Sequence, residues 1–273
     1  MDARELFKAD RIEEAVEAQT AAVKANPRDP EQRYLLVALL GFLGQWERAA
    51  RQLDALGLDD DKLTAAGRVY RQLLAAEVER QAVFAEGHRP LAPPDPPAHL
   101  EARLRALAAL REDGAKAASA ELDAAVAVQP ELAGSLNGEP FAGLRDQDDR
   151  LGSVLEVFAG GHYLWLPLER VRRLEIEAPS HLLDLLWIPA SLEDAEGAQA
   201  TVHLPVLYEG SAATGRGELR RGRATEWEDL GGEVYRGLGQ RVLAFGRPDG
   251  EAEELDLLSL RRLEVDASGA GEA

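Results

Sequence analysis

The sequence predicts an α+β fold, with a tetratricopeptide-like helical repeat domain over residues 1–130 and a small β-rich domain over residues 131–273. Between about Glu5 and Val128 the chain is rich in Ala, Leu, Glu, Arg and Gln, and its apolar residues recur every three or four positions, as on one face of a helix. After Gln129 glycines and prolines separate short runs of β-branched and aromatic residues. Short strands in this pattern indicate a small barrel or a curled antiparallel sheet.

The first part of the helical half is expected to contain two pairs of short helices. Apolar residues on either side of Asp10 describe two helices that meet there, and Asn26-Pro27 ends the second, because proline disfavours a helical residue before it. A second pair is expected from Tyr34 to Leu43 and from Trp46 to Leu56, with Gly44 as the break between them.

A six-residue pattern repeats within this half. Residues 10–15, with the sequence Asp-Arg-Ile-Glu-Glu-Ala, lie 34 residues before residues 44–49, with the sequence Gly-Gln-Trp-Glu-Arg-Ala, and this is the period of tetratricopeptide repeats. A turn-forming residue, a large apolar residue and an alanine at these spacings suit a tight turn between closely packed helices. A weaker third copy at residues 113–118 extends the pattern, so stacked helical hairpins are predicted.

Two further segments complete the helical half. Residues 64–84 are expected to form one long helix. Residues 89–97 hold five prolines and cannot be helical, so we interpret them as an extended connector between helical segments. The alternative interpretation is a polyproline ligand for an aromatic groove, which no other feature of the sequence supports.

The β-rich half is expected to begin with one short helix at about residues 151–158, ended by Gly160-Gly161. Short apolar runs separated by turn residues then predict strands. These runs cover residues 162–167, 171–176, 183–188, 200–207, 234–235, 241–245 and 260–265.

Composition limits the classes of partner. The 273 residues carry 31 Lys and Arg against 49 Asp and Glu, a formal net charge of −18, which disfavours nucleic acid and anionic membranes as partners. The chain has no Cys, so disulfides, thiolate metal sites and cysteine nucleophiles are excluded. The sequence shows no signal peptide and no run of 18 apolar residues, and we expect a cytoplasmic protein.

Motifs that carry chemistry are missing from the sequence. The five histidines form no metal-binding motif, and no nucleophile elbow or Walker loop occurs. Asp146, Asp148 and Asp149 form an acidic cluster without the glycine and the distal glutamate of a calcium loop, so a helix cap or a hydrogen-bonded turn is favoured. We therefore expect no catalytic residues, no cofactor and no metal site. A hydrolase that uses the aspartate cluster is the enzymatic alternative.

Seven strings distributed over nearly the whole chain together resemble one protein family. They are LGQWERA at residues 43–49, LNGEPF at 136–141, DRLGSVLE at 149–156, YLWLP at 163–167, LWIPA at 186–190, TEW at 225–227 and GLGQR at 237–241. In these strings the chain resembles the ImpE, SciE or TagJ accessory proteins of bacterial type VI secretion systems. The resemblance implies a non-enzymatic cytoplasmic protein that binds a helix near the N-terminus of the small sheath subunit TssB. It also implies a possible link to the ClpV unfoldase, which dismantles contracted sheaths.

Stacked helical hairpins leave a concave surface that can receive an amphipathic helix. We therefore expect a partner-binding groove in the helical half, with the β-rich half bracing it. The residues expected to contribute to this groove are Tyr34, Val37, Leu40, Trp46 and Tyr70. Trp227 lies among charged residues and is expected to add a partner contact. The alternative function is a general peptide-binding scaffold or chaperone of tetratricopeptide type, unrelated to secretion.

Overall fold

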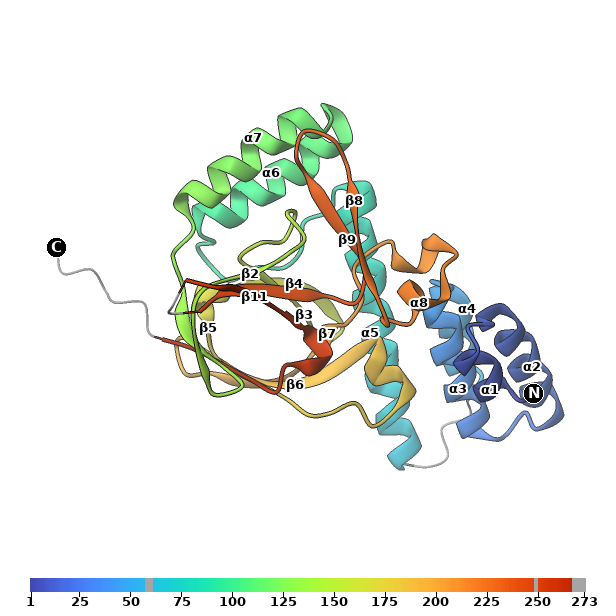
Figure 1. Ribbon diagram of the computed structural model, residues 1–273. Helices are drawn as coiled ribbons and strands as arrows, with labels where there is room; N and C mark the ends of the chain where they lie inside the picture. Colours follow the sequence, from blue (N-terminus) through green and yellow to red (C-terminus); the bar gives the residue numbers. More distant parts are fainter. Residues whose placement is uncertain (57–60, 248–249, 267–273) are drawn as a thin grey trace.

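The computed structural model describes residues 1–56, 61–247 and 250–266 of the chain. It combines helices with a curled, ten-stranded antiparallel sheet, which confirms the α+β class (Figure 1). Helices occupy the chain up to Val128, and the first strand begins at Ala133. Among the described residues, no helix has both the length and the apolar character needed to cross a membrane.

The described part of the first half folds into seven helices. They are α1 (Ala3–Lys8), α2 (Ile12–Ala25), α3 (Pro30–Phe42), α4 (Trp46–Asp54), α5 (Asp61–Glu86), α6 (Ala98–Glu112) and α7 (Ala115–Val128). The expected breaks are confirmed at Asp10 and Gly44, whose φ angles of 64° and 66° lie in the left-handed region. Asp2 caps α1 and Asp29 caps α3, because each side chain accepts hydrogen bonds from backbone N–H groups of the first helical turn.

Helix α5 is the long helix that the sequence predicts, and it connects the helical half to the sheet. It contacts strands β3 (Val154–Ala159) and β4 (His162–Pro167). Helices α6 and α7 form a hairpin that lies apart from α1–α4, on the other side of α5 (Figure 1). Gly114, with a φ angle of 87°, lies in the turn of this hairpin.

The proline-rich segment 89–97 is extended, as expected, and it covers one edge of the sheet. Leu91 N–H donates to the carbonyl of Tyr163 at 3.0 Å, and Trp165 N–H donates to the carbonyl of Leu91 at 2.8 Å. These two bonds form a parallel bridge to β4, which is an end strand of the sheet. The connector therefore occupies backbone groups that would otherwise form an open edge.

The sheet has the strand order β11-β10-β2-β1-β12-β5-β6-β7-β3-β4, and every paired neighbour is antiparallel. Its remaining strands are β1 (Ala133–Leu136), β2 (Glu139–Asp146), β5 (Val171–Ile176), β6 (Trp187–Asp194), β7 (Gln199–Pro205), β10 (Val242–Gly246), β11 (Ala252–Asp256) and β12 (Arg262–Val265). A separate hairpin pairs β8 (Thr225–Asp229) with β9 (Tyr235–Gly239), and a short helix, α8 (Gly217–Arg220), precedes it.

The helix expected at residues 151–158 is wrong, because this segment is a turn followed by strand β3. Residues 154–158 of β3 are all buried, so their apolar run shows no alternation, and such a run cannot be distinguished from a buried helix by periodicity. Gly160 and Gly161 have φ angles of 60° and 93° and form the turn of the β3–β4 hairpin, not a helix end.

Other strands differ from expectation in extent. Residues 182–185 form a short 3-10 turn, and β6 begins only at Trp187. Strands β1, β2, β8 and β11 were not expected. Asn137 and Gly138, with φ angles of 53° and 89°, form the two-residue turn between β1 and β2, so the glycine marked a hairpin within the sheet.

Both halves of the chain share one hydrophobic core. The main cluster runs from Ala3 in α1 to Val265 in β12 and includes residues of α3, α5 and most strands of the sheet. A second, smaller cluster holds the α6–α7 hairpin against the β8–β9 connection, and it consists of Ala106, Ala109, Ala118, Leu122 and Val234.

Candidate functional site

Three of the five residues expected to line a helical groove are buried in the protein's own core. Val37 and Leu40 are 0% and 1% exposed, so they belong to the core and offer no surface to a partner. Trp46 is also buried, and its ring packs against that of Trp187 with centroids 5.7 Å apart. The expectation that these three side chains line an open groove is therefore corrected. The physical reason is that α3 packs against the turn before β6, where a Cβ at Gly41 would lie 2.6 Å from Leu186.

The other three expected residues keep some exposed surface. Tyr34 and Tyr70 are half-buried and contact each other edge to face, with ring centroids 5.3 Å apart. Trp227 lies on β8, 39% exposed, and its ring meets that of Tyr208 edge to face at 5.7 Å. These residues lie in two separate places, so the structure does not bring all six expected residues into one site.

A network of buried charged side chains lies where α5 meets the sheet. Its centre is Glu156 on β3, which is 0% exposed. Arg80 of α5 donates from Nε and Nη2 to the two carboxylate oxygens of Glu156, at 2.7 and 3.1 Å. Nη1 of Arg241 lies 2.9 Å from Glu156 Oε2, and the hydroxyl of Tyr163 donates to Oε1. One carboxylate thus joins three distant parts of the chain.

Helix α5 contributes a second carboxylate to this network. Glu77 lies one turn before Arg80, and Arg80 Nη1 donates to its Oε1 at 3.3 Å. The indole Nε1 of Trp187 donates to Glu77 Oε2 at 3.2 Å, which connects α5 to β6. Arg80 Nη2 also donates to the backbone carbonyl of Leu207 at 3.0 Å. The inner face of α5 is therefore attached to the sheet by polar contacts as well as by apolar packing.

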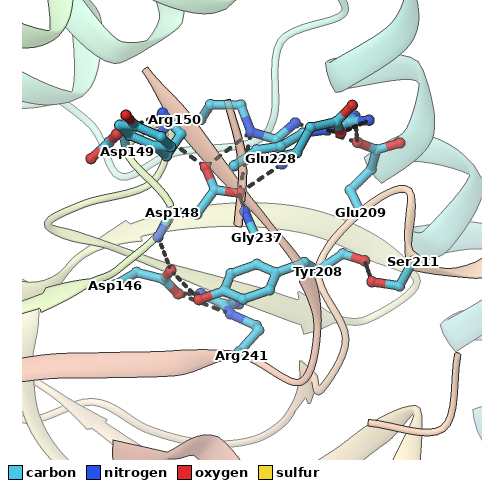
Figure 2. Close-up of polar contacts among 12 residues, drawn as sticks. Asp146, Asp148, Asp149, Arg150, Tyr208, Glu209, Ser211, Glu228, Gly237 and Arg241 are labelled. Atoms are coloured by element: carbon cyan, nitrogen blue, oxygen red, sulfur yellow. Dashed lines mark hydrogen bonds and ion pairs between the residues drawn. The ribbon is translucent and has the colours of Figure 1, made fainter. Parts of the chain in front are cut away.

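The aspartate cluster forms the other branch of the network. Figure 2 shows Asp146 between Arg241, which donates from Nε and Nη2 at 3.0 and 2.6 Å, and Tyr208, whose hydroxyl donates at 2.9 Å. Asp148 accepts from the Arg150 side chain at 2.7 to 3.2 Å and from the N–H of Gly237 at 3.1 Å. These contacts connect the turn before β3 to the β8–β9 hairpin.

Within this turn the aspartates also bind backbone groups. Asp148 N–H donates to the Asp146 carboxylate at 2.9 Å, and Arg150 N–H donates to the Asp148 carboxylate at 3.0 Å. Side-chain acceptors two residues before their donors are typical of Asx turns. The hydrogen-bonded turn favoured by the sequence analysis is thus confirmed.

Burial opposes every charge in the network, and the arginines determine which carboxylate stays ionised. Burial by itself raises the pKa of Glu156, but Arg80 and Arg241 outweigh it and hold the pKa at about 2. Burial raises the pKa of Glu77, which Arg80 offsets only in part. Burial also raises the pKa of Asp146; the nearby charge of Asp148 adds to this effect, and Arg241 offsets it only in part. Of Glu77, Asp146 and Glu156, only Glu156 has a pKa below its ordinary value, so the arginines hold it as an anion.

The network is suited to fixing the positions of structural elements. The carboxylates of Glu77, Glu156, Asp146 and Asp148 all accept hydrogen bonds from arginine, tyrosine, tryptophan or backbone donors within the protein. In the described ranges, no three His, Asp or Glu side chains are grouped as metal ligands would be. Buried networks in which each carboxylate has hydrogen-bond donors favour one arrangement of the elements that they join.

Sequence reasoning missed Glu77, Arg80, Glu156 and Arg241. The available signals were a single charged residue, Glu156, within the apolar run of β3, and an arginine, Arg241, directly before the apolar run of β10. A charge inside a buried run needs a partner. The partner itself could not be identified, since Arg80 lies 76 residues from Glu156 in the chain.

The chain is similar in sequence and in fold to known proteins. The profile of the family described as "ImpE protein" matches residues 138–263. The chain is 36% identical over 270 residues to the type VI secretion system accessory component TagJ of Pseudomonas aeruginosa, and the alignment covers 99% of this chain and 93% of TagJ. The crystal structure of protein VPA1032 from Vibrio parahaemolyticus has a TM-score of 0.86 and 25% identity, with 97% of each chain covered. Similarity therefore extends over the helical half as well as the sheet.

Proposed function

Because the chain belongs to the ImpE family, of which TagJ is a type VI secretion accessory component, we propose that it is a non-enzymatic adaptor of such a system. In this proposal it binds a helix of the small sheath subunit TssB and is linked to the ClpV unfoldase. The observation that carries the proposal is the extent of the similarity to TagJ, which includes 99% of the chain. An accessory role that depends on both halves of the protein accounts for similarity over both.

The buried network supports an adaptor rather than a catalyst. Its carboxylates are engaged by donors of the protein itself, and the aspartate cluster that suggested a hydrolase holds a turn and a hairpin together. Charged groups used in this way stabilise the shape of a binding protein. The enzymatic alternative thereby loses the residues on which it was based.

The charge of the chain supports a basic partner segment. A formal net charge of −18 attracts a helix that carries Lys or Arg, and it increases the rate of association at low salt more than the final affinity. A TssB helix of basic character fits this requirement.

Two positions of the helical half support the tetratricopeptide-like interpretation, which we retain as part of the proposal. Asp10 and Gly44, 34 residues apart, have φ angles of 64° and 66°. The alanines five residues later, Ala15 and Ala49, are both 0% exposed. Equivalent turns and equivalent close contacts at this period are typical of stacked helical hairpins. They also favour the second candidate function, a general peptide-binding scaffold.

A titration of the purified protein with a labelled peptide from the N-terminal helix of TssB tests the proposal. We expect saturable binding with a Kd of tens of micromolar or below, weakened by added salt. ClpV is tested in the same way, by co-sedimentation with the protein in the presence and absence of TssB. Absence of saturable binding by the TssB peptide contradicts the adaptor function and leaves the general scaffold as the better candidate.

A further inference from the structure

A groove runs between helix α7 and the face of the sheet. One face of α7 forms its first wall, with Ser119, Leu122, Asp123 and Val126 at helical spacing, and the C-cap residue Gln129 continues the wall beyond the end of the helix. Two pockets, of about 500 and 310 Å³, meet along this wall and share Val126 and Gln129. From Ser119 to Val126 the helical part of the wall is about 10 Å long at 1.5 Å per helical residue, and Gln129 lengthens it.

The wider part of the groove is apolar. Its floor is formed by Ala142 of β2 and Ala244 of β10, which keep exposed surface, and by the edges of Leu144 and Phe245, which are 4% and 8% exposed. Val126 borders this floor and is 58% exposed, although it is an aliphatic side chain on an otherwise well-packed hairpin. Val126 and this floor line one pocket, and it is contiguous apolar surface of this kind, more than a single exposed side chain, that marks an interaction site.

The pairing of the strands decides which backbone fits this floor. Strand β2 is hydrogen-bonded to β1 and β10, and β10 is hydrogen-bonded to β2 and β11. An extended peptide on this floor would find no free backbone groups and would leave its own N–H and C=O groups without partners. A helix satisfies those groups internally and presents only side chains. The floor therefore favours a helical occupant, which would lie beside α7.

The charge of the groove favours a basic occupant. The charged side chains that line the two pockets are Asp123, Glu131, Asp149, Glu233, Arg103 and Arg145. Arg103 is 2% exposed and donates to the backbone of Asp149 and to Gln129, so it supports the wall from within. Arg145 pairs with Asp149 at 3.5 Å. Within the described part of the chain, the three exposed carboxylates of Asp123, Glu131 and Glu233 form no ion pair.

We propose that this groove binds a basic amphipathic helix of about three turns, and the proposal rests on the proposed function in which that helix belongs to TssB. Aliphatic side chains at positions i, i+3 or i+4, and i+7 of the partner pack between Val126 and the floor of β2 and β10. Lys or Arg residues on the flanks of the partner helix face Asp123 and Glu233. An isolated helix of three turns is marginal in water, so the partner gains helicity as it binds.

The chain offers a matched pair of variants to test this site. Val126 and Val128 lie on the same helix and are 58% and 56% exposed, but only Val126 lines the groove. Val126→Lys places a charged ammonium group in the groove, while Val128→Lys places the same group on the helix outside the groove. Because both side chains face solvent in the free protein, neither substitution should alter the fold, which circular dichroism and thermal unfolding verify. Asp123→Lys tests the charged part of the groove.

The measurement is a fluorescence anisotropy titration with the fluorescein-labelled TssB peptide. Loss of the contacts of one buried aliphatic side chain corresponds to about tenfold weaker binding. We expect at least this loss for Val126→Lys, a loss of about threefold for Asp123→Lys at low salt, and a change of less than about twofold for Val128→Lys. Circular dichroism of the complex should show an increase in helix signal over the sum of its components.

Each other outcome overturns a defined statement. If the wild type binds the peptide and both Val126→Lys and Asp123→Lys bind it equally well, this groove is not the binding site, although the adaptor function stands. No binding by the wild type rejects the adaptor function and this site with it. Binding without a gain in helix signal rejects the helical occupant and indicates an extended segment. If light scattering shows a dimer that Val126→Lys dissociates and Val128→Lys does not, the occupant is a second copy of this chain and the proposal is wrong.

Discussion

Replacing Glu156 with Gln tests how much the buried network stabilises the fold. The substitution keeps the size of the side chain but removes the charge that faces Arg80 and Arg241. Arg80 keeps its contact with Glu77, and Arg241 keeps its contact with Asp146. Removal of one partner from a buried ion pair costs about 3 to 5 kcal/mol. A decrease of the pKa from 4.5 to about 2 corresponds to about 3 kcal/mol at neutral pH, so the two values agree.

The pH dependence of this effect has a defined sign. The pKa of Glu156 is lower in the folded protein than in the unfolded chain, so its contribution to stability is present above pH 4.5 and is lost as the pH falls towards 2. Gln cannot be ionised and lacks this contribution at every pH. The difference in the free energy of unfolding between wild type and Glu156→Gln should therefore decrease from about 3 kcal/mol at pH 7 to about 1.4 kcal/mol at pH 3.

Urea unfolding followed by tryptophan fluorescence, at several pH values between these limits, measures this difference. Glu254→Gln is the matched control, because Glu254 is an exposed glutamate on strand β11 and its replacement should change stability by less than about 0.5 kcal/mol. The reasoning is refuted if Glu156→Gln behaves like the control, or if its effect is the same at pH 7 and pH 3.

Three further substitutions test other parts of the structure. Burial raises the pKa of Glu77, so its contribution to the free energy of unfolding declines as the pH rises above 4.5. In the same urea assay, the stability of Glu77→Gln relative to wild type should therefore increase between pH 4 and pH 7. A decrease over this range would contradict the sign. Gly152 has a φ angle of 50°, and Gly152→Ala would place a Cβ 2.3 Å from Cζ of Arg103. We expect a destabilisation of about 2 kcal/mol or more, measured by thermal unfolding. An unchanged Tm would show that the Arg103 side chain moves aside. Trp227→Ala should cost about 1 kcal/mol of stability because an edge-to-face ring contact is lost. The same variant should bind the TssB peptide more weakly in the anisotropy titration. An unchanged affinity would show that Trp227 does not contact the partner.

Local signals in the sequence were sufficient to locate the breaks between α1 and α2 and between α3 and α4. Gly44 and the residues around Asp10 mark tight turns that depend on the chain within a few residues, and the structure has the breaks there. The same approach failed at β3, because both faces of this strand are buried and its pattern is that of any buried segment. It also failed at Asn137-Gly138, a strong hairpin signal from which the strands β1 and β2 were not predicted.

The site could not be predicted from local sequence patterns, because it is formed by contacts between residues far apart in the chain. Val37 and Leu40 were assigned to a groove because a solenoid leaves one face of its helices open, but in this chain both are buried in α3, which packs against α2, α4 and the turn before β6. The pairing of Arg241 with Asp146, 95 residues apart, requires the register of β10 against β2. A single sequence shows that such charges need partners without showing which partners they have.

Strand β10 connects the buried network to the proposed groove. Arg241, directly before β10, is fixed by Asp146 and Glu156, while Phe245 near its other end forms part of the groove floor. The floor is thus held by strands that are hydrogen-bonded on both sides and by the ion pairs of Arg241 with Asp146 and Glu156. The opposite wall, α7, packs along α6 and is held by the small apolar cluster around Leu122 and Val234, while Leu100 and Leu107 of α6 belong to the main core. A helix that enters the groove would therefore meet a floor and a wall that are both already formed, so its affinity depends mainly on its contacts with Val126 and the floor.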